Sequence, residues 1–248
     1  MALVLWHGGE YRRATGLSRD RVFRRDLTGG RGCHGRTTKL REHDGRRMSG
    51  KIDLFRQHAD EYLARPEPSV VEVAPASYIG IQGGGAPEDM PFQGGLAALF
   101  ALAFTLKSVV REAAGYDFAV GKLEALWWTD RPGAFWQAPR SAWRWCLLIR
   151  VPDMVDQPAI EAARAHLAAR RRAPDAARAA RVRLEEGRCL QVLHVGPYAT
   201  EPESIARLEQ AATAAGMAFA GHHHEIYLSD PRRTVATKLR TILRRPVR

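Results

Sequence analysis

The sequence predicts an α+β fold that contains a duplicated structural unit, and three observations support this prediction. The 248 residues are 45% hydrophobic and 26% charged, which is the composition of a globular chain with one large or two small domains. Each half of the chain reads as a strand, a glycine-containing bend, a helix and a further strand. The units match at an offset of 100 residues, since residues 126–130 (LWWTD) correspond to residues 226–230 (IYLSD). Two such units side by side would form an antiparallel sheet packed on helices, with a cleft between the copies.

The first unit follows a short helical segment. Residues 52–63 (IDLFRQHADEYL) place apolar side chains on one side at helical spacing, and Pro66 ends this helix. Residues 69–82 predict a strand with an irregularity at Pro75. Residues 91–114 predict a long helix that is apolar around most of its circumference, so we expect this helix to be buried.

Four strands and one helix are predicted after the long helix. Residues 123–129 (LEALWWT) and 143–151 (WRWCLLIRV) predict strands joined by a loop that is rich in proline and glycine. Residues 158–172 are rich in alanine and arginine and predict a helix with proline in its first turn. Residues 181–186 and 189–195 predict two strands on either side of a glycine turn.

The chain ends with two predicted helices and one strand between them. Thr200 and Glu203 have the spacing of a capping box, and the helix that they begin ends at Gly216. Residues 223–229 predict the last strand, and residues 234–243 predict a short amphipathic helix.

The net charge of +11 is concentrated at the start of the chain. Residues 1–47 hold 12 Lys and Arg against 5 Asp and Glu and show no hydrophobic periodicity, so they cannot form a core. A basic arm that binds phosphates and an unstructured leader ahead of a start at Met48 are both consistent with this segment, and we favour the leader. We therefore expect a folded domain over residues 48–248, with modules at about 69–152 and 180–230, and no direct nucleic-acid partner.

Cysteine use and hydropathy predict a cytoplasmic protein. Cys33, Cys146 and Cys189 are too few and too scattered for a disulfide framework or a four-cysteine zinc site. The longest apolar run, residues 94–106, is shorter than the roughly 20 residues that a membrane helix needs. No signal peptide opens the chain.

Aromatic residues form the densest chemical feature. Five of the six tryptophans lie within 19 residues, namely Trp127, Trp128, Trp136, Trp143 and Trp145. Alternation along a strand directs Trp127 and Trp128 to opposite faces and places Trp143 and Trp145 on one face. The concentration indicates an aromatic wall for a flat apolar or cationic ligand, and core packing is the alternative interpretation.

A second candidate feature is the run of residues 222–227 (HHHEIY). Three consecutive histidines alternate faces on a strand and cannot converge on one ion, so no metal site is expected. Glu225 and Tyr227 point the same way, towards a cleft or towards solvent. A carboxylate beside a phenol on the inner side of a sheet is costly unless it is hydrogen-bonded or used. Position alone leaves open whether Glu225 is a surface residue.

Three segments resemble the stand-alone GyrI-like (DNA-gyrase-inhibitor-like) small-molecule-binding family. They are residues 123–128 (LEALWW), 194–198 (HVGPY) and 223–233 (HHEIYLSDPRR), and the resemblance covers the chain from about residue 51. It implies two β-α-β-β (SHS2-type) modules that form a curved antiparallel sheet, with helices on one side and a ligand cleft between the modules. It also implies that Glu225 meets the ligand. No helix-turn-helix pattern accompanies these segments.

The resemblance implies three functions that the residues do not separate. The first is hydrolysis of reactive cyclopropane-bearing genotoxins, with Glu225 as general base and Tyr227 orienting the water. The second is sequestration of aromatic or cationic drugs without turnover, and the third is inhibition of a protein such as gyrase, a contact that we do not expect. No cofactor is expected, and the protein is expected to be a monomer or weak homodimer. The candidate ligand-binding residues are Trp127, Trp128, Trp145, Phe135, Tyr78, His194 and Tyr198.

Overall fold

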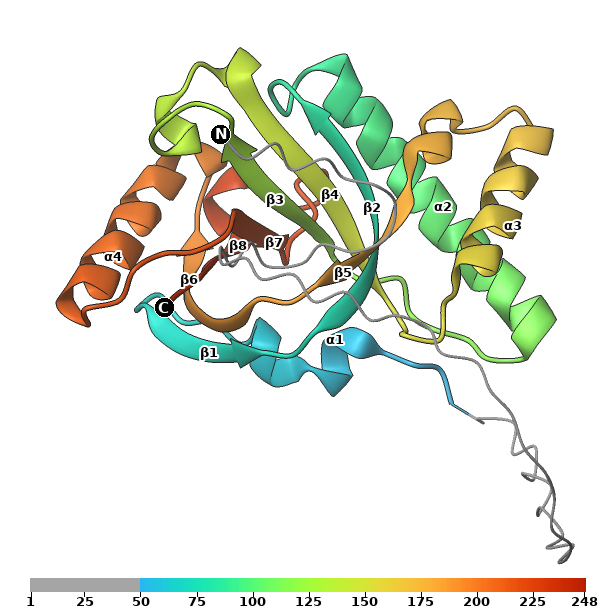
Figure 1. The fold of residues 1–248 in the computed structure, drawn as a ribbon, viewed down its shortest axis with the longest axis horizontal. Coiled ribbons are helices and arrows are strands. Elements are labelled where there is room, and N and C mark those ends of the chain that lie inside the picture. Colours follow the sequence, from blue (N-terminus) through green and yellow to red (C-terminus); the bar gives the residue numbers. More distant parts are fainter. Residues whose placement is uncertain (1–49) are drawn as a thin grey trace, which may run out of the picture.

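The structure is a computed structural model, and it describes residues 50–248 (Figure 1). The predicted basic leader over residues 1–47 lies outside the described residues. An eight-stranded antiparallel sheet curls into a half-barrel, and three long helices pack on one side of it. These helices are α2 (Met90–Ala114), α3 (Gln157–Ala169) and α4 (Glu201–Ala214). The predicted α+β class and the curved antiparallel sheet are therefore confirmed.

The sheet consists of two copies of one strand pattern. Its order is β1-β6-β8-β7-β3-β4-β2-β5. The units β2-α2-β3-β4 and β6-α4-β7-β8 each place their last strand in the middle, and they join along β3 and β7. The strands are β1 (Ser69–Val73), β2 (Ala76–Gly84), β3 (Leu123–Thr129), β4 (Trp143–Val151), β5 (Ala180–Leu184), β6 (Gly187–Val195), β7 (His223–Tyr227) and β8 (Arg240–Pro246).

The two units exchange their outer strands. β1 precedes β2 in the chain but pairs with β6, and β5 precedes β6 but pairs with β2. The two ladders share one register, so that Ser69 lies opposite Gln191 and Ala76 lies opposite Leu184. The strands predicted on either side of Gly187 are therefore not partners in a hairpin. Instead they continue one long ribbon, interrupted near Pro75, that curls the sheet.

Hydrophobic clusters cover both faces of the sheet. We call the face that α2, α3 and α4 cover the helix face, and the opposite face the inner face. Ile79 of β2 packs with Leu102 of α2 on the helix face, and Leu190 of β6 packs with Leu208 of α4 on the same face. On the inner face, Ile226 of β7 packs with Tyr62, which belongs to the short helical turn η1 (Ala59–Tyr62).

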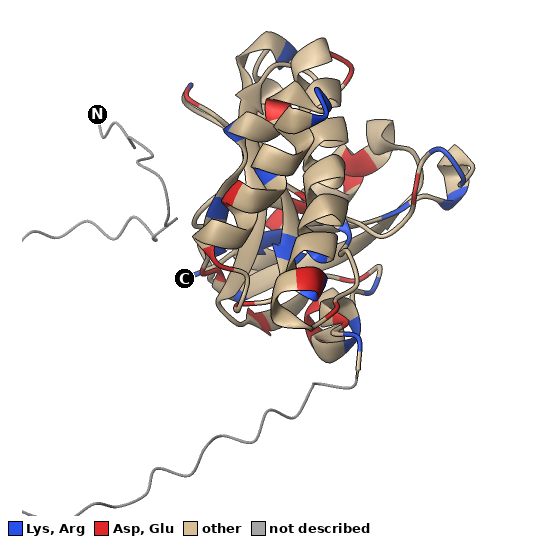
Figure 2. Cartoon of the chain, turned by 90° about the vertical axis from the view of Figure 1, so that its right-hand side faces the viewer, with Lys and Arg blue, Asp and Glu red and all other residues tan. Residues whose placement is uncertain are grey.

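The long helix α2 is buried along one side only. Leu99, Leu102 and Leu106 are fully buried against the sheet, whereas Phe104 is 58% exposed, which corrects the expectation of a helix buried all round. By length and composition alone, α2 could cross a membrane, with a mean hydropathy of 1.5. Its packing against β2 and α3 identifies it as the core helix of this fold. On the side drawn in Figure 2, basic and acidic residues are interspersed along the helices.

Three local predictions are wrong. Residues 52–63 form two short turns, α1 (Leu54–Gln57) and η1, because His58 leaves helical geometry between them. No capping box forms, since the Thr200 hydroxyl donates to the carbonyl of Pro197 instead of capping α4. Residues 240–246 form strand β8 rather than a helix, and the second unit therefore extends beyond residue 230.

Candidate functional site

Strands β3 and β7 meet at the centre of the sheet and present a hydrogen-bonded chain on the helix face. Ala125 lies directly opposite Glu225, and Trp127 lies opposite His223. The indole Nε1 of Trp127 is 3.3 Å from the hydroxyl of Tyr227 and donates to it. The Tyr227 hydroxyl in turn donates to Oε2 of Glu225 over 2.6 Å. The two proposed catalytic residues and the first tryptophan of the aromatic cluster are thus in contact.

Aromatic rings surround Trp127 on the helix face. Its ring is stacked with those of Phe92 and Phe135, with centroid distances of 5.6 and 5.9 Å. Trp143 meets Trp127 edge-on at 5.7 Å, and Trp145 meets Phe92 edge-on at 5.3 Å. Trp145 is fully buried. Four of the rings come from the β3–β4 hairpin, as the sequence predicts, and Phe92 comes from the first turn of α2.

The glycines of β2 make room for this cluster. A Cβ atom on Gly83 would lie 2.3 Å from the Trp145 ring, which no side chain could tolerate. A Cβ atom on Gly95 of α2 would approach the same ring to 3.3 Å. Gly83 and Gly95 therefore allow the backbone of β2 and of α2 to pack closely on Trp145.

A second carboxyl group, that of Glu201, belongs to the cluster and was missed by sequence reasoning. Glu201 is the first residue of α4 and is only 8% exposed. Its carboxyl lies next to Thr241 of β8, which lies directly opposite Tyr227 in the sheet. Its Oε1 atom is buried and has no hydrogen-bond partner among the described residues. In the sequence, Glu201 is an acidic residue next to the predicted helix start. The capping-box spacing of Thr200 and Glu203 explained that start without giving Glu201 a role.

Burial sets the protonation of this cluster. Desolvation, and then the neighbouring Glu225 carboxylate, raise the pKa of Glu201 to about 10. Burial and the carboxylates of Glu225 and Glu201 also raise the pKa of Tyr227 well above its ordinary range. Near neutral pH, therefore, Glu201 carries a proton and Tyr227 remains a hydrogen-bond donor.

The three histidines of the run lie in three different surroundings. His223 Nε2 is 3.4 Å from Oε1 of Glu225, and its ring packs against Phe135. His222 stacks on Trp128 with a centroid distance of 4.5 Å, and burial lowers its pKa to about 4. His224 is fully buried on the inner face. Among residues 50–248, no group of three or more His, Cys, Asp or Glu is arranged to hold a metal ion.

The remaining candidate ligand-binding residues do not all lie with Glu225. Tyr78 and Trp128 belong to the inner-face cluster around Leu148, so strand alternation separates them from Glu225 by the thickness of the sheet. Tyr198 lies on the helix face, 40% exposed, and its ring meets that of Tyr227 edge-on at 6.0 Å.

His194 supports the turn that carries Tyr198. Its Nδ1 atom lies 2.9 Å from the hydroxyl of Ser204, and its Nε2 atom lies 3.1 Å from the carbonyl oxygen of Pro197. The imidazole therefore joins β6 to the start of α4. This places His194 behind Tyr198 and Glu201 rather than on the surface that a ligand would meet.

The aromatic cluster is closed in this structure. Trp136 packs against the cores of both units, and its ring meets that of His223 at 5.9 Å, so it bridges the space between α2 and α4. A hollow of about 300 Å³ lies between α3 and residues 172–177, and no residue of the aromatic cluster lines it. The loop of residues 130–142, which carries Phe135 and Trp136, covers the site.

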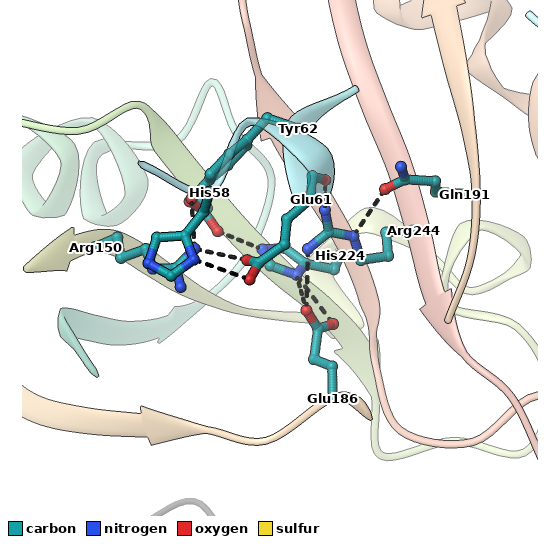
Figure 3. A network of polar contacts seen from close by, with 9 residues as sticks. His58, Glu61, Tyr62, Arg150, Glu186, Gln191, His224 and Arg244 are labelled. Carbon is teal, nitrogen blue, oxygen red and sulfur yellow. Dashed lines mark hydrogen bonds and ion pairs between the residues drawn. The ribbon is translucent and has the colours of Figure 1, made fainter. Parts of the chain in front are cut away.

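A second buried polar network lies on the inner face, behind the same strands (Figure 3). The His224 imidazole has Glu124 3.0 Å from Nε2 and Glu186 3.0 Å from Nδ1. Arg244 contacts Glu186 at 3.4 Å and donates to the carbonyl oxygen of Glu61. Further contacts in this network include Arg150 to Glu61 at 2.7 Å, His58 to Glu61 at 3.2 Å, Tyr62 to Glu124 at 2.8 Å and Arg244 to Gln191 at 3.1 Å.

The charges of this inner network balance. Burial opposes a charge on His224, but Glu186 and Glu124 outweigh it and raise the pKa of His224 to about 9. Burial opposes ionisation of Glu186 as well, yet His224 and Arg244 lower its pKa to about 2. Three carboxylates therefore face two guanidinium groups and one imidazolium. The network fastens η1 to the sheet and holds β7 from behind.

Comparison with known proteins assigns the family. Residues 66–248 match the model of the GyrI-like small molecule binding domain. The chain belongs to the GyrI-like family. Two solved structures of hydrolases from Listeria innocua are similar to this GyrI-like protein, at 33% and 32% identity with TM-scores of 0.70 and 0.72. An uncharacterized conserved protein from the same organism is 33% identical, with a TM-score of 0.73.

The similarity extends over the whole described domain. Each of these three comparisons covers 80% of this chain and 100% of the other. No curated protein matches this GyrI-like protein. The family and the fold together establish a small-molecule-binding domain.

Proposed function

We propose that this GyrI-like protein is a hydrolase that binds flat aromatic electrophiles and adds water to an activated cyclopropane. The observation that carries the proposal is the chain of contacts from Trp127 through Tyr227 to Glu225, which joins a stacking surface to a buried carboxylate. The two Listeria innocua hydrolases, at 32–33% identity over their full length, support the choice of reaction class.

Substrate binding begins with stacking on Trp127. A flat aromatic ring replaces Phe135 against the Trp127 face, after the loop of residues 130–142 moves outward. Phe92 remains stacked on Trp127 and keeps the indole in place. Stacked pairs of this kind contribute about 0.5–1.5 kcal/mol beyond the burial of apolar area.

Ring opening then needs a base near the bound ring. Glu225 accepts a proton from water while the water oxygen bonds to a cyclopropane carbon. The strained carbon–carbon bond breaks, and its electron pair moves into the conjugated carbonyl group of the substrate. Tyr227 donates to Glu225 and fixes the direction of that carboxylate. A general base in this role contributes typically 10²–10⁴-fold to the rate.

A direct test is the conversion of a cyclopropane-fused dienone by the purified protein. We expect a product heavier by one water, formed in excess over the protein and detected by mass spectrometry. Glu203→Gln, which should keep full turnover, is the matched control for substitutions of the buried carboxyl groups, since Glu203 is exposed on the same helix as Glu201. Binding of one equivalent of the compound per protein without formation of product would contradict hydrolysis. It would indicate sequestration, with Glu225 as the counter-charge for a cationic ligand.

A further inference from the structure

We propose that Glu201 is a second catalytic residue, which gives a proton to the substrate oxygen while Glu225 takes the proton of water. This inference rests on the proposed hydrolase function and assigns the acid that the reaction requires. Opening a ring conjugated to a carbonyl places negative charge on the carbonyl oxygen. A group that protonates or hydrogen-bonds this oxygen lowers the barrier.

The geometry places Glu201 in the same cluster as Glu225. The helix α4 begins at Glu201, and the side chain packs towards β8, where its carboxyl group lies next to Thr241. Thr241 is the ladder partner of Tyr227, so Glu201 and Glu225 approach Tyr227 from two different elements. Glu201 is more than nine-tenths buried, and its Oε1 atom has no hydrogen-bond partner in the described part of the chain. A buried, unpartnered carboxyl oxygen is costly unless a ligand meets it.

The surroundings of Glu201 favour its acid form. A position at a helix N-terminus by itself favours the carboxylate. Burial and the like charge of Glu225 outweigh that effect, so that the pKa of Glu201 is raised. The other titratable groups of this cluster are Tyr227 and His223 of β7 and Tyr198 ahead of α4. None of the ion pairs found among residues 50–248 brings a lysine or arginine to Glu201 or Glu225.

The two carboxyl groups divide the proton transfers between them. Glu225 is the base, and Glu201 is the acid, because Glu201 holds its proton near neutral pH while Glu225 contacts the Tyr227 hydroxyl and His223. Water supplies the hydroxyl group that bonds to carbon, and its proton goes to Glu225. The proton of Glu201 goes to the carbonyl oxygen, which becomes a hydroxyl group. The proton then returns from Glu225 to Glu201 through solvent, so substrate plus one water gives one product.

The test combines kinetics with the protonation state of the carboxyl group. In Glu201→Gln, we expect kcat for the cyclopropane-fused dienone to fall about 10²-fold, the scale for loss of an acid or base, with KM nearly unchanged. The fall of wild-type kcat at alkaline pH, where Glu201 loses its proton, should disappear in this variant. Glu203→Gln should keep both kcat and its pH profile. Melting temperatures near neutral pH show whether Glu201→Gln is folded, which we expect because glutamine matches the uncharged acid in shape.

A second readout needs no substrate. Difference infrared spectroscopy of the full chain at neutral pH should show a carboxylic acid band that Glu201→Gln loses and Glu203→Gln keeps. Absence of this band, or unchanged kcat in Glu201→Gln, would overturn the role of Glu201 while leaving the hydrolase function intact. If the wild-type protein shows the band but does not turn over the dienone, the hydrolase function fails, and the acid role fails with it.

Discussion

Strand β7 separates two buried polar clusters whose electrostatics differ. On the inner face, His224 lies between Glu124 and Glu186, and each carboxylate of that network faces a positive partner. On the helix face, Glu225 and Glu201 share one cluster, whose direct contacts are a phenol, a threonine and the imidazole of His223. Residues adjacent in the chain thus enter a balanced network on one side and a surplus of acid on the other.

The buried polar groups of the two faces therefore have different roles, stability on the inner face and chemistry on the helix face. Removing one member of a charge-balanced buried network leaves another charge unpaired, so the inner face acts as a fastening. A buried cluster that holds more carboxyl groups than positive partners, one of them with an unpartnered oxygen, destabilises the fold. Such a cluster is a candidate functional site.

The largest effect is expected on the inner face. Arg244→Met removes the partner of Glu186 and of the Glu61 carbonyl oxygen, so the free energy of unfolding should fall by about 3–5 kcal/mol. Urea unfolding measures this loss. Arg232→Met is the matched control, because Arg232 pairs with Asp230 on the exposed surface, and its transition should not move. Equal transitions for both variants would contradict a fastening role for the inner network.

A substitution of Glu201 on the helix face is expected to increase the free energy of unfolding instead of lowering it. The raised pKa of Glu201 means that the folded state holds a proton which the unfolded state releases above about pH 4.5. Wild-type stability should therefore fall as pH rises towards 10, by at most about 1.4 kcal/mol per pH unit. Glu201→Gln removes this slope, so it should gain stability over wild type as pH rises. Urea unfolding between pH 5 and 6.5 measures the gain, and parallel curves would contradict it.

The chosen pH range keeps the inner network out of that measurement. His224 has a raised pKa, so its stabilising contribution is complete below about pH 6.5 and is lost as pH rises through about 9. Glu186 has a lowered pKa, and its contribution is lost only as pH falls from about 4.5 through about 2. Between pH 5 and 6.5, this network therefore contributes an almost constant amount. The titration of His222, whose pKa is lowered to about 4, changes the stability of wild type and variant equally.

A smaller effect separates the two neighbouring tryptophans. Trp127→Leu removes the stacking surface on the helix face, so affinity for a neutral flat aromatic ligand should fall about tenfold, or 1.4 kcal/mol. Trp128→Leu changes the inner face, where Trp128 stacks on His222, and affinity should remain the same. Calorimetric titration of both variants measures the difference. Equal losses of affinity would contradict the separation of the two faces.

The sequence predicted the strands at the centre of the sheet well. Residues 123–129 and 143–151 form strands with the predicted bounds, because turn-forming residues flank compact apolar runs. Strand β8 was not predictable in the same way. It lies between β6 and β7 and buries both faces, with Thr241 and Arg244 at core positions. A buried arginine carries no strand signal until its partner Glu186 is known.

The candidate site was predictable where strand alternation alone decides it. The side chains of Glu225 and Tyr227 share a face because they are two residues apart on one strand, and Trp143 and Trp145 do so for the same reason. Glu201 could not be found this way, since a helix packed over β8 brings it to Thr241. Tyr78 and Trp128 were assigned to the ligand by residue type. Alternation already directs Trp128 to the face opposite Trp127, whereas only the sheet register places Tyr78 on that inner face.

The variant Glu225→Gln shows whether the helix face of β7 performs the chemistry through Glu225. Turnover of a neutral cyclopropane-fused dienone and affinity for the same compound are measured on one preparation. Turnover should fall by about 10²-fold or more, since the amide cannot accept the proton of water. Affinity should change by less than about tenfold, because the contacts of Trp127 are intact. Unchanged turnover, or a collapse of affinity for the neutral compound, would contradict the account.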